Sequence, residues 1–128
     1  MQSFNKNEKL KSRKIIDEIF KSGKSLLEFP LKLYYIPIVE EAETIIQFGV
    51  SVPKKNIKRA VKRNLLKRRI KEAYRLNKSR LLNDECFKGA KYAFLIVYLE
   101  KSEINYHSIE EKIISLLNRF KTIHEKSI

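Results

Sequence analysis

The chain has 128 residues, a formal net charge of +13 and 43% hydrophobic residues, with only three glycines and three prolines. That length suits one domain with a single core, which we expect to span residues 1–128. Its ends, at about 1–8 and 122–128, are expected to be flexible. The composition excludes a disordered chain. A lone cysteine, Cys86, excludes an intramolecular disulfide and indicates a reducing compartment. Because no signal-peptide pattern or membrane-length apolar run occurs, we expect a cytoplasmic protein without a membrane partner.

The first periodic segment, "SRKIIDEIFKSGKS", has the apolar spacing of a short amphipathic helix. Ser12 is its expected N-cap and Gly23 its expected C-terminal stop. The apolar positions are Ile15, Ile16, Ile19 and Phe20. On spacing alone, Phe20 is expected to pack into the core.

Two strands are expected next, in "LKLYYI" and "TIIQFGVSVP", on either side of an acidic turn "EEAE" at 40–43. In the first strand, Leu31, Leu33 and Tyr35 alternate with Lys32, Tyr34 and Ile36. In the second, Phe48, Val50 and Val52 alternate with Gln47, Gly49 and Ser51. The small polar face of the second strand either lies open to water or allows a ligand backbone to approach at Gly49.

A strongly basic helix is expected from about Ile57 to Asn77, with Asn56 as a possible cap. Between Lys54 and Arg80 there are thirteen Lys or Arg and one acid, Glu72, whereas the remaining residues carry fifteen bases and fourteen acids. Nearly all of the positive excess therefore belongs to one segment. Such a compact block produces a strong positive potential over one surface and indicates a polyanionic partner.

The angular positions of the residues divide this helix into two faces. The outer face carries Asn64, Lys67, Arg68, Lys71, Arg75 and Lys78, and the face that should contact the sheet carries Leu66, Ile70, Ala73, Tyr74 and Asn77, with Arg63 at the boundary. The outer face is either a solvated surface or a surface specialised for binding. Like charges at i,i+4 repel, as at Lys67–Lys71 and Lys71–Arg75, and only Arg68–Glu72 attracts, so binding is favoured. Asn64 could contact a base edge or remain solvated.

The remaining elements are a strand and a second amphipathic helix. The run "YAFLIVYL" is apolar throughout, as expected of a strand that is covered on both faces. The last helix should open at the capping-box pattern "SIEE", with Ser108 as N-cap and Glu111 as its partner. Helices and strands in this order predict an α+β sandwich.

Catalysis by the chain's own side chains is not expected. His107 and His124 are the two histidines, and no carboxylate cluster has the spacing of a two-metal site. The acidic turn at 40–43 could bind magnesium, but a solvated turn is the simpler interpretation. We therefore predict no catalytic residue and no metal ligand in this chain.

The stretch "FGVSVPKK" followed by "AVKRNLLKRRIKEAYR" resembles the signature of the bacterial ribonuclease P protein subunit. That signature is a Gly-x-Ser-x-x-Lys-Lys strand end and a helix that bears Arg-Asn-Arg and further bases. The resemblance extends from about Leu10 to about Phe120. It implies a single-domain αβββαβα sandwich with a left-handed βαβ crossover, a fold type also found in the second domain of a small-subunit ribosomal protein.

The resemblance also implies a function. The chain would be a subunit of an endoribonuclease whose RNA component hydrolyses a phosphodiester with bound Mg²⁺ and releases the 5′ leader of precursor tRNA. The protein would bind the ribonuclease P RNA and the leader, with no obligatory protein partner. Contacts with the catalytic RNA would come from Arg59, Lys62, Arg63, Asn64, Lys67, Arg68, Lys71, Arg75 and Lys78. A leader-binding cleft would be lined by Ile16, Phe20, Lys32, Tyr34, Gln47, Ser51, Lys54 and Lys55.

Two departures from the family signature are present. The third motif position, usually Arg, is Leu65, and one extra residue lies between Lys55 and Ala60. Arg59, Lys62 or Arg69 could restore the missing charge. The alternative function is that of a ribosomal or other structural RNA-binding protein. A DNA-binding module is disfavoured, because no second helix with a short turn precedes the basic helix.

Overall fold

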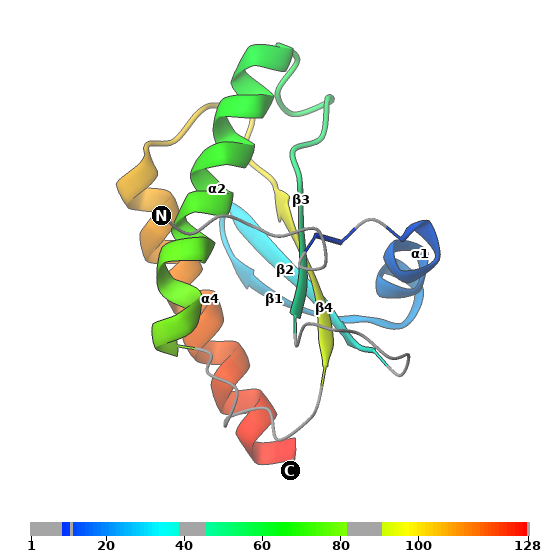
Figure 1. Cartoon of the computed structure of the whole chain (residues 1–128). Coiled ribbons are helices and arrows are strands. Elements are labelled where there is room, and N and C mark those ends of the chain that lie inside the picture. The colour runs from blue at the N-terminus through cyan, green and yellow to red at the C-terminus, as the bar shows by residue number, and fades with distance from the viewer. Residues whose placement is uncertain (1–8, 11, 39–45, 82–90, 128) are drawn as a thin grey trace.

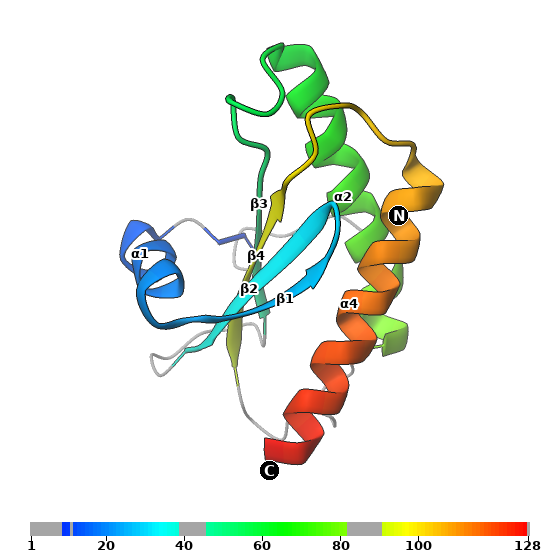
Figure 2. The ribbon, with the colours of Figure 1, turned by 180° about the vertical axis from the view of Figure 1, so that it is seen from behind.

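The computed structural model describes residues 9–10, 12–38, 46–81 and 91–127 and has an α+β architecture. Its elements are α1 (Arg13–Ser22), β1 (Lys24–Glu28), β2 (Leu31–Pro37), β3 (Ile46–Ser51), α2 (Ala60–Leu81), β4 (Tyr92–Tyr98) and α4 (Tyr106–Ser127). Four strands form one sheet in the order β1-β2-β4-β3, with β3 parallel to β4 and the other pairs antiparallel. Helices α2 and α4 cover one face and α1 covers part of the other (Figure 1). Seen from behind, the β1–β2 hairpin lies nearest the viewer, with α4 beside β1 (Figure 2).

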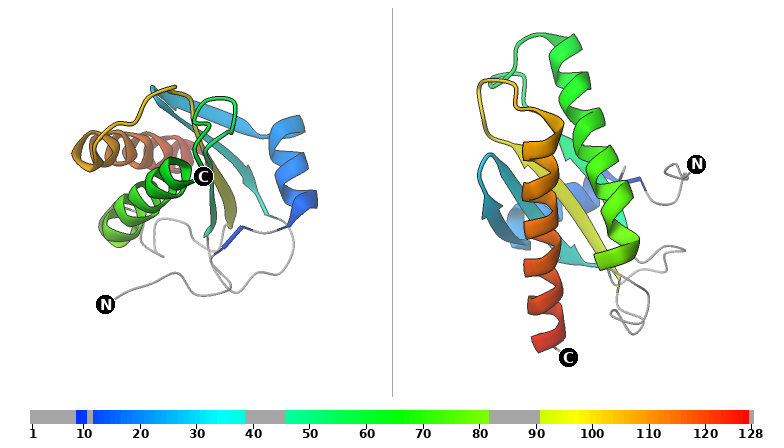
Figure 3. Two further views of the ribbon diagram at one scale, coloured as in Figure 1. Left: turned by 90° about the horizontal axis from the view of Figure 1, so that it is seen from above. Right: turned by 90° about the vertical axis from the view of Figure 1, so that its left-hand side faces the viewer.

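The crossover from β3 through α2 to β4 is left-handed, as the resemblance implied. In the right-hand view of Figure 3, α2 and α4 lie in front of the sheet and β3 lies to the right of the parallel strand β4. Both strands run upward in this view, and a chain that leaves the upper end of the right-hand strand, descends in front through α2 and returns on the left makes a left-handed connection. Such connections are rare, because the strand twist favours the opposite hand.

Two apolar clusters lie on the two sides of the sheet. The larger cluster fills the space between the sheet and helices α2 and α4, where Phe94, Ile96 and Tyr98 of β4 face inward. The smaller cluster joins Ile19 of α1 to the opposite side of β4 at Ala93 and Leu95. The apolar run in β4 is therefore explained by burial on both faces, as predicted.

Helix α1 has the limits that its capping residues predict. The Ser12 side chain accepts a hydrogen bond from the Ile15 backbone N–H at 3.3 Å, and the Gly23 N–H donates to the Ile19 carbonyl at 2.9 Å. A Cβ atom at Gly23 would collide with the Ile19 carbonyl oxygen and lie 3.0 Å from the Tyr35 carbonyl oxygen. Glycine is needed here because the chain turns directly into the sheet.

The predicted start of the basic helix was wrong. Helix α2 begins at Ala60, and the preceding residues form a turn in which the Asn56 and Ile57 N–H groups donate to the Pro53 carbonyl. The Asn56 side chain does not cap the helix, because its Nδ2 donates to the Tyr98 carbonyl at 3.0 Å. Ile57 is buried in the larger cluster, and its burial favours the turn over an earlier helix start.

The predicted capping box of the last helix was also wrong. Helix α4 begins at Tyr106, and Asn105 is its N-cap, with Oδ1 accepting from the Ser108 N–H at 2.8 Å. Asparagine caps a helix as well as serine does. At the other end α4 continues through Ser127, whereas residues 1–8 lie outside the described residues. The flexibility of both ends stays a prediction.

Strand β1 is the element that residue patterns did not indicate, although the family fold implied a third strand before the basic helix. Only Leu26 of its five residues is buried, so the alternation of a half-buried strand is nearly absent. In contrast, β2 shows the predicted alternation, with Leu31, Leu33 and Tyr35 buried.

Candidate nucleic-acid interface

The inner face of α2 is the one that the angular analysis predicted. All five predicted contact residues are buried, and Tyr74 stacks on Phe48 of β3 with ring centroids 3.8 Å apart. These five residues are Leu66, Ile70, Ala73, Tyr74 and Asn77. Their burial fixes the rotation of the helix, so the opposite side must face solvent.

The predicted basic stripe lies on the outward side of α2. Asn64, Arg68 and Lys71 are exposed, and Lys67, Arg75 and Lys78 are half-buried. No Asp or Glu occurs from Ile46 to Lys71, so the charged residues in this stretch of the chain are all positive. Several side chains along one helix can therefore contact successive phosphates of a polyanion.

Two arginines of the basic segment donate hydrogen bonds within the protein. The Arg63 Nη1 donates to the Ile57 and Lys58 carbonyls at 3.0 and 2.7 Å, so the guanidinium holds the turn before α2. The Arg69 Nη1 donates to the Ile104 carbonyl at 2.7 Å and lies 3.3 Å from Glu103 Oε2. Arg69 therefore ties α2 to the segment before α4. Of the three candidates to replace the motif arginine at Leu65, only Arg59 and Lys62 are exposed.

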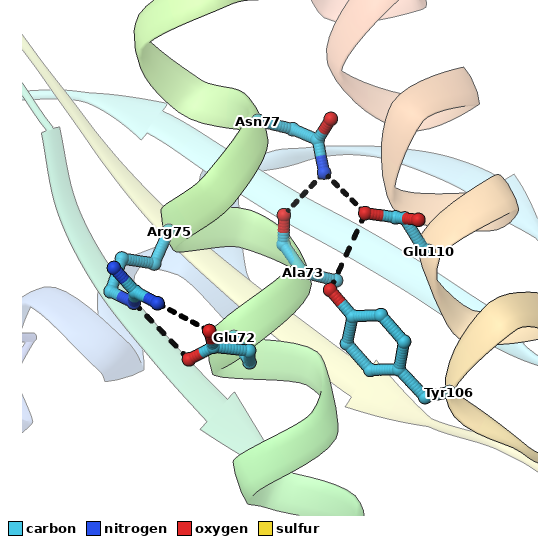
Figure 4. A network of polar contacts seen from close by, with 6 residues as sticks. All are labelled: Glu72, Ala73, Arg75, Asn77, Tyr106 and Glu110. Atoms are coloured by element: carbon cyan, nitrogen blue, oxygen red, sulfur yellow. Dashed lines mark hydrogen bonds and ion pairs between the residues drawn. The ribbon is translucent and has the colours of Figure 1, made fainter. Parts of the chain in front are cut away.

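The acid in α2 has a different partner from the expected one. Glu72 accepts two hydrogen bonds from the Arg75 guanidinium, one of them from Nε at 3.1 Å, rather than pairing with Arg68 (Figure 4). The hydrogen bond to Glu72 raises the pKa of Arg75. Arg68, which was expected to be attracted to Glu72, is left exposed on the stripe.

A polar network holds α2 against α4 (Figure 4). The Asn77 Nδ2 donates to the Ala73 carbonyl at 2.7 Å and to Glu110 Oε2 at 3.1 Å, and Glu110 also accepts from the Tyr106 hydroxyl at 3.3 Å. Burial and the adjacent Glu110 carboxylate raise the pKa of Tyr106. Sequence reasoning missed Glu110 and Tyr106 as positioning residues. The signal was Asn77, a polar residue on an apolar helix face, which needs a buried partner.

A second surface lies on the α1 side of the sheet. Phe20 is 57% exposed, so its expected burial in the core was wrong. Its ring meets the Tyr34 ring edge to face at 5.1 Å, and the Lys32 Nζ lies 5.0 Å from the Tyr34 ring centroid. Two aromatic rings and one cation are thereby brought together where a base can stack beside a phosphate.

Three of the other predicted cleft residues, Ile16, Gln47 and Ser51, lie on the same side of the sheet as Tyr34. Ser51 of β3 lies in the same row across the sheet as Lys32 of β2, because both residues pair with Val97 of the intervening strand β4. Gln47 of β3 pairs with Ala93 of β4 in the same way. Ile16 of α1 packs against the smaller cluster. Lys54 and Lys55 are exposed in the turn that follows β3.

Gly49 is not open to a ligand backbone. A Cβ atom at this position would lie 3.2 Å from the Leu10 Cβ, and Leu10 is itself buried. The Leu10 N–H donates to the Phe48 carbonyl at 3.0 Å, and Lys9 forms a parallel bridge with Phe48. The close approach that glycine allows is therefore made by the chain's own N-terminal segment.

The histidines make structural contacts. His107 Nε2 lies 3.0 Å from Glu111 Oε1 on the surface of α4, and the buried His124 Nδ1 lies 2.9 Å from the Tyr92 hydroxyl. No three His, Cys, Asp or Glu side chains come together to hold a metal within the residues that the structure describes. Cys86 and the acidic turn at 40–43 lie outside those residues. Within the described part of the chain, no helix is long and apolar enough to cross a membrane.

The fold and its surface define a small α+β protein with one strongly cationic helix face. A family model described as Ribonuclease P matches residues 4–121. Proteins described as ribonuclease P protein component are similar in sequence to this chain. The Porphyromonas gingivalis protein is 36% identical over 89% of this chain and 83% of its own length, and the Chlorobium phaeobacteroides protein is 32% identical over 94% and 90%. The chain therefore belongs to the ribonuclease P protein family.

Solved structures of this family share the fold. The Staphylococcus aureus RNase P protein superposes with a TM-score of 0.71 at 23% identity, covering 89% of this chain and 95% of the other. The Thermotoga maritima RNase P protein gives a TM-score of 0.66 at 24% identity, covering 88% and 96%. The predicted fold class is confirmed.

Proposed function

We propose that this chain binds the catalytic RNA of ribonuclease P and the 5′ leader of precursor tRNA, and so assists removal of the leader. Membership of the family supports a role in tRNA processing as a component of ribonuclease P. The observation that carries the proposal is the outward face of α2, which carries bases and no acid from Ala60 to Lys71 and is held in a fixed rotation by five buried side chains. Such a face favours a phosphate backbone over an uncharged partner.

The two surfaces have different tasks in this proposal. The bases on α2 bind phosphates of the catalytic RNA, with the exposed Lys62, Arg68 and Lys71 among the contacts. The pair formed by Phe20 and Tyr34, with Lys32 beside it, stacks on a leader base and binds a neighbouring phosphate. The chain thus holds a substrate strand near the RNA and does not perform the chemistry itself.

Hydrolysis of the phosphodiester is assigned to the RNA component, which would supply the Mg²⁺ site. The described residues of this chain contain no group of three His, Cys, Asp or Glu side chains that fits the ion. The protein contributes positive charge near the phosphates, which lowers their mutual repulsion where the two RNAs meet. This contribution should be greatest at low Mg²⁺ concentration.

Reconstitution tests the proposal. The purified chain alone should leave precursor tRNA intact, and the chain with ribonuclease P RNA should cleave the leader at a low Mg²⁺ concentration at which the RNA alone is slow. Absence of stimulation would refute the proposed role. Co-sedimentation of the chain with ribosomal subunits after a high-salt wash would instead favour a structural role in the ribosome.

Substitution of Tyr34 tests the leader surface separately. Tyr34→Ala should weaken binding of leader-bearing substrate to the holoenzyme by roughly 1–3 kcal/mol, because a stacked base loses its platform. Tyr34→Phe keeps the ring and should retain most of the affinity. Equal losses for precursor and mature tRNA would contradict leader binding at this residue.

A further inference from the structure

The first two turns of α2 expose an apolar pair within the basic surface. Val61 is 77% exposed, the largest value among the exposed large hydrophobic residues of the described chain. Leu65, one turn later, is half-buried and lies on the same side of the helix. Asn64 and Arg68 flank the pair, so the residues at i, i+3, i+4 and i+7 form one continuous patch.

The charges around this patch indicate a polyanion. Lys58, Arg59 and Lys62 are exposed next to it, and the first turn of α2 carries no acid, although acids in that turn stabilise a helix through its dipole. A phosphate gains little from Val61 or Leu65, because aliphatic side chains provide no charge or hydrogen bond. The part of a nucleic acid that can cover them is the face of an unpaired base or a ribose.

The motif arginine in this region is also not directed toward a ligand. Arg63 donates to the Ile57 and Lys58 carbonyls, so its guanidinium fixes the start of α2 and the position of Val61. Leu65 occupies the third motif position, where the family usually has arginine. Of the three motif positions, only Asn64 presents an exposed polar group to a partner.

We propose that Val61 and Leu65 form a contact site for one unpaired nucleotide of the partner RNA, with Asn64 at the base edge and Arg68 at the adjoining phosphate. This inference rests on the proposed function, because it names the chemistry at one position of the same RNA surface. The chain replaces an arginine contact by apolar contact with a base. Affinity at this position therefore depends on covered apolar area rather than on charge.

Substitutions at the two apolar residues test the site with ribonuclease P RNA as the probe. Val61→Ser and Leu65→Gln keep similar helix propensities. Each should weaken binding about threefold to tenfold, leave the slope of log K against log salt unchanged, and restore chemical reactivity to one base that the unchanged chain protects. Lys62→Ala should instead lower that slope by about 0.7–0.9.

Leu76→Gln is the matched control. Leu76 is 53% exposed on the same side of α2, about 22 Å further along the axis and beyond Glu72, so its replacement should change neither binding nor protection. Unchanged RNA binding and base protection in both Val61→Ser and Leu65→Gln would overturn the inference while leaving the proposed function intact. Loss of binding by Leu65→Gln alone, with a lower melting temperature, would also overturn it by showing a packing role. An unchanged chain that does not bind this RNA would refute both.

Discussion

Helices α2 and α4 have 22 residues each and lie side by side on the same face of the sheet, yet they use charge differently. Helix α2 carries nine Lys or Arg and one acid, whereas α4 carries four Lys or Arg and three acids. In α4, the Arg119 Nη1 donates to the Leu27 carbonyl and to Glu28 Oε2, both at 2.7 Å, and closes part of the β1 edge. In α2, Arg63 and Arg69 donate hydrogen bonds that hold the fold, whereas Lys62, Arg68 and Lys71 are exposed to solvent.

The difference shows how a fold can stabilise a helix that has a large excess of positive charge. Like charges along α2 repel one another, and each such contact costs a few tenths of a kcal/mol. Burial of the apolar face opposes this cost, as do contacts with the balanced helix α4 through Asn77 and Glu110. Helix α4 therefore acts mainly in stability, and α2 combines stability with the surface that we propose to bind RNA.

The largest expected effect concerns the packing of α4. Phe120 is 1% exposed and meets the rings of Tyr35, Tyr92 and Phe94 at centroid distances of 5.1, 4.9 and 4.7 Å. Phe120→Ala should lower the free energy of unfolding by about 3–5 kcal/mol, measured by urea denaturation. Leu76→Ala on the exposed side of α2 should change it by less than about 0.5 kcal/mol. Equal losses in the two variants would remove the distinction between the helices.

The next effect separates the bases of the two helices. Arg68→Ala combined with Lys71→Ala should lower the salt slope of binding to ribonuclease P RNA by nearly two units, since each phosphate contact contributes about 0.7–0.9. At about 0.15 M salt this corresponds to roughly 20-fold weaker binding. The pair Lys112→Ala and Lys121→Ala on α4 removes the same charge and should leave the slope unchanged. A similar decrease in both pairs would show that total charge, not the α2 face, determines binding.

A smaller effect is expected at the contact between the helices. Glu110→Ala removes the acceptor of the Asn77 amide and the Tyr106 hydroxyl, and should cost about 1–1.5 kcal/mol of unfolding free energy. The adjacent Glu111→Ala loses only an exposed pair with His107 and should cost less than about 0.5 kcal/mol. Thermal denaturation of the two variants distinguishes these values. Identical melting curves would mean that the network does not fix α2.

The smallest effect is a pH dependence at the same contact. Burial, with the Glu110 carboxylate nearby, raises the pKa of Tyr106, so the folded state keeps a proton that the unfolded state loses above about pH 10. The resulting stabilisation is present below that pH and is lost as the pH rises through the folded-state pKa. As the pH rises above about 10, the free energy of unfolding should therefore fall less in Tyr106→Phe than in the unchanged chain. Tyr98→Phe should show a larger difference, because burial raises the pKa of Tyr98 to about 12.

Local patterns predicted much of this molecule because they depend on neighbouring residues. Helical spacing, together with Ser12 and Gly23, predicted α1, and the angular positions in α2 identified its five buried residues. Neighbouring residues did not reveal β1, because an edge strand with one buried side chain has little alternation. They also misplaced the starts of α2 and α4, where a turn at Pro53 and a cap at Asn105 decide the boundary.

The amino-acid sequence by itself determined which residues could form the basic surface, because charge and helical period are properties of consecutive residues. It also determined the family, since the motif is a local pattern. Only the tertiary structure decided which of those bases remain outward. Arg63 and Arg69 are turned toward carbonyls from Ile57, Lys58 and Ile104, Leu10 covers Gly49, and Phe20 stands exposed beside Tyr34. The contacts of Arg69, Gly49 and Phe20 join segments that are distant in sequence, and the contacts of Arg63 depend on the turn that the burial of Ile57 fixes, so no local pattern in the chain encodes these outcomes.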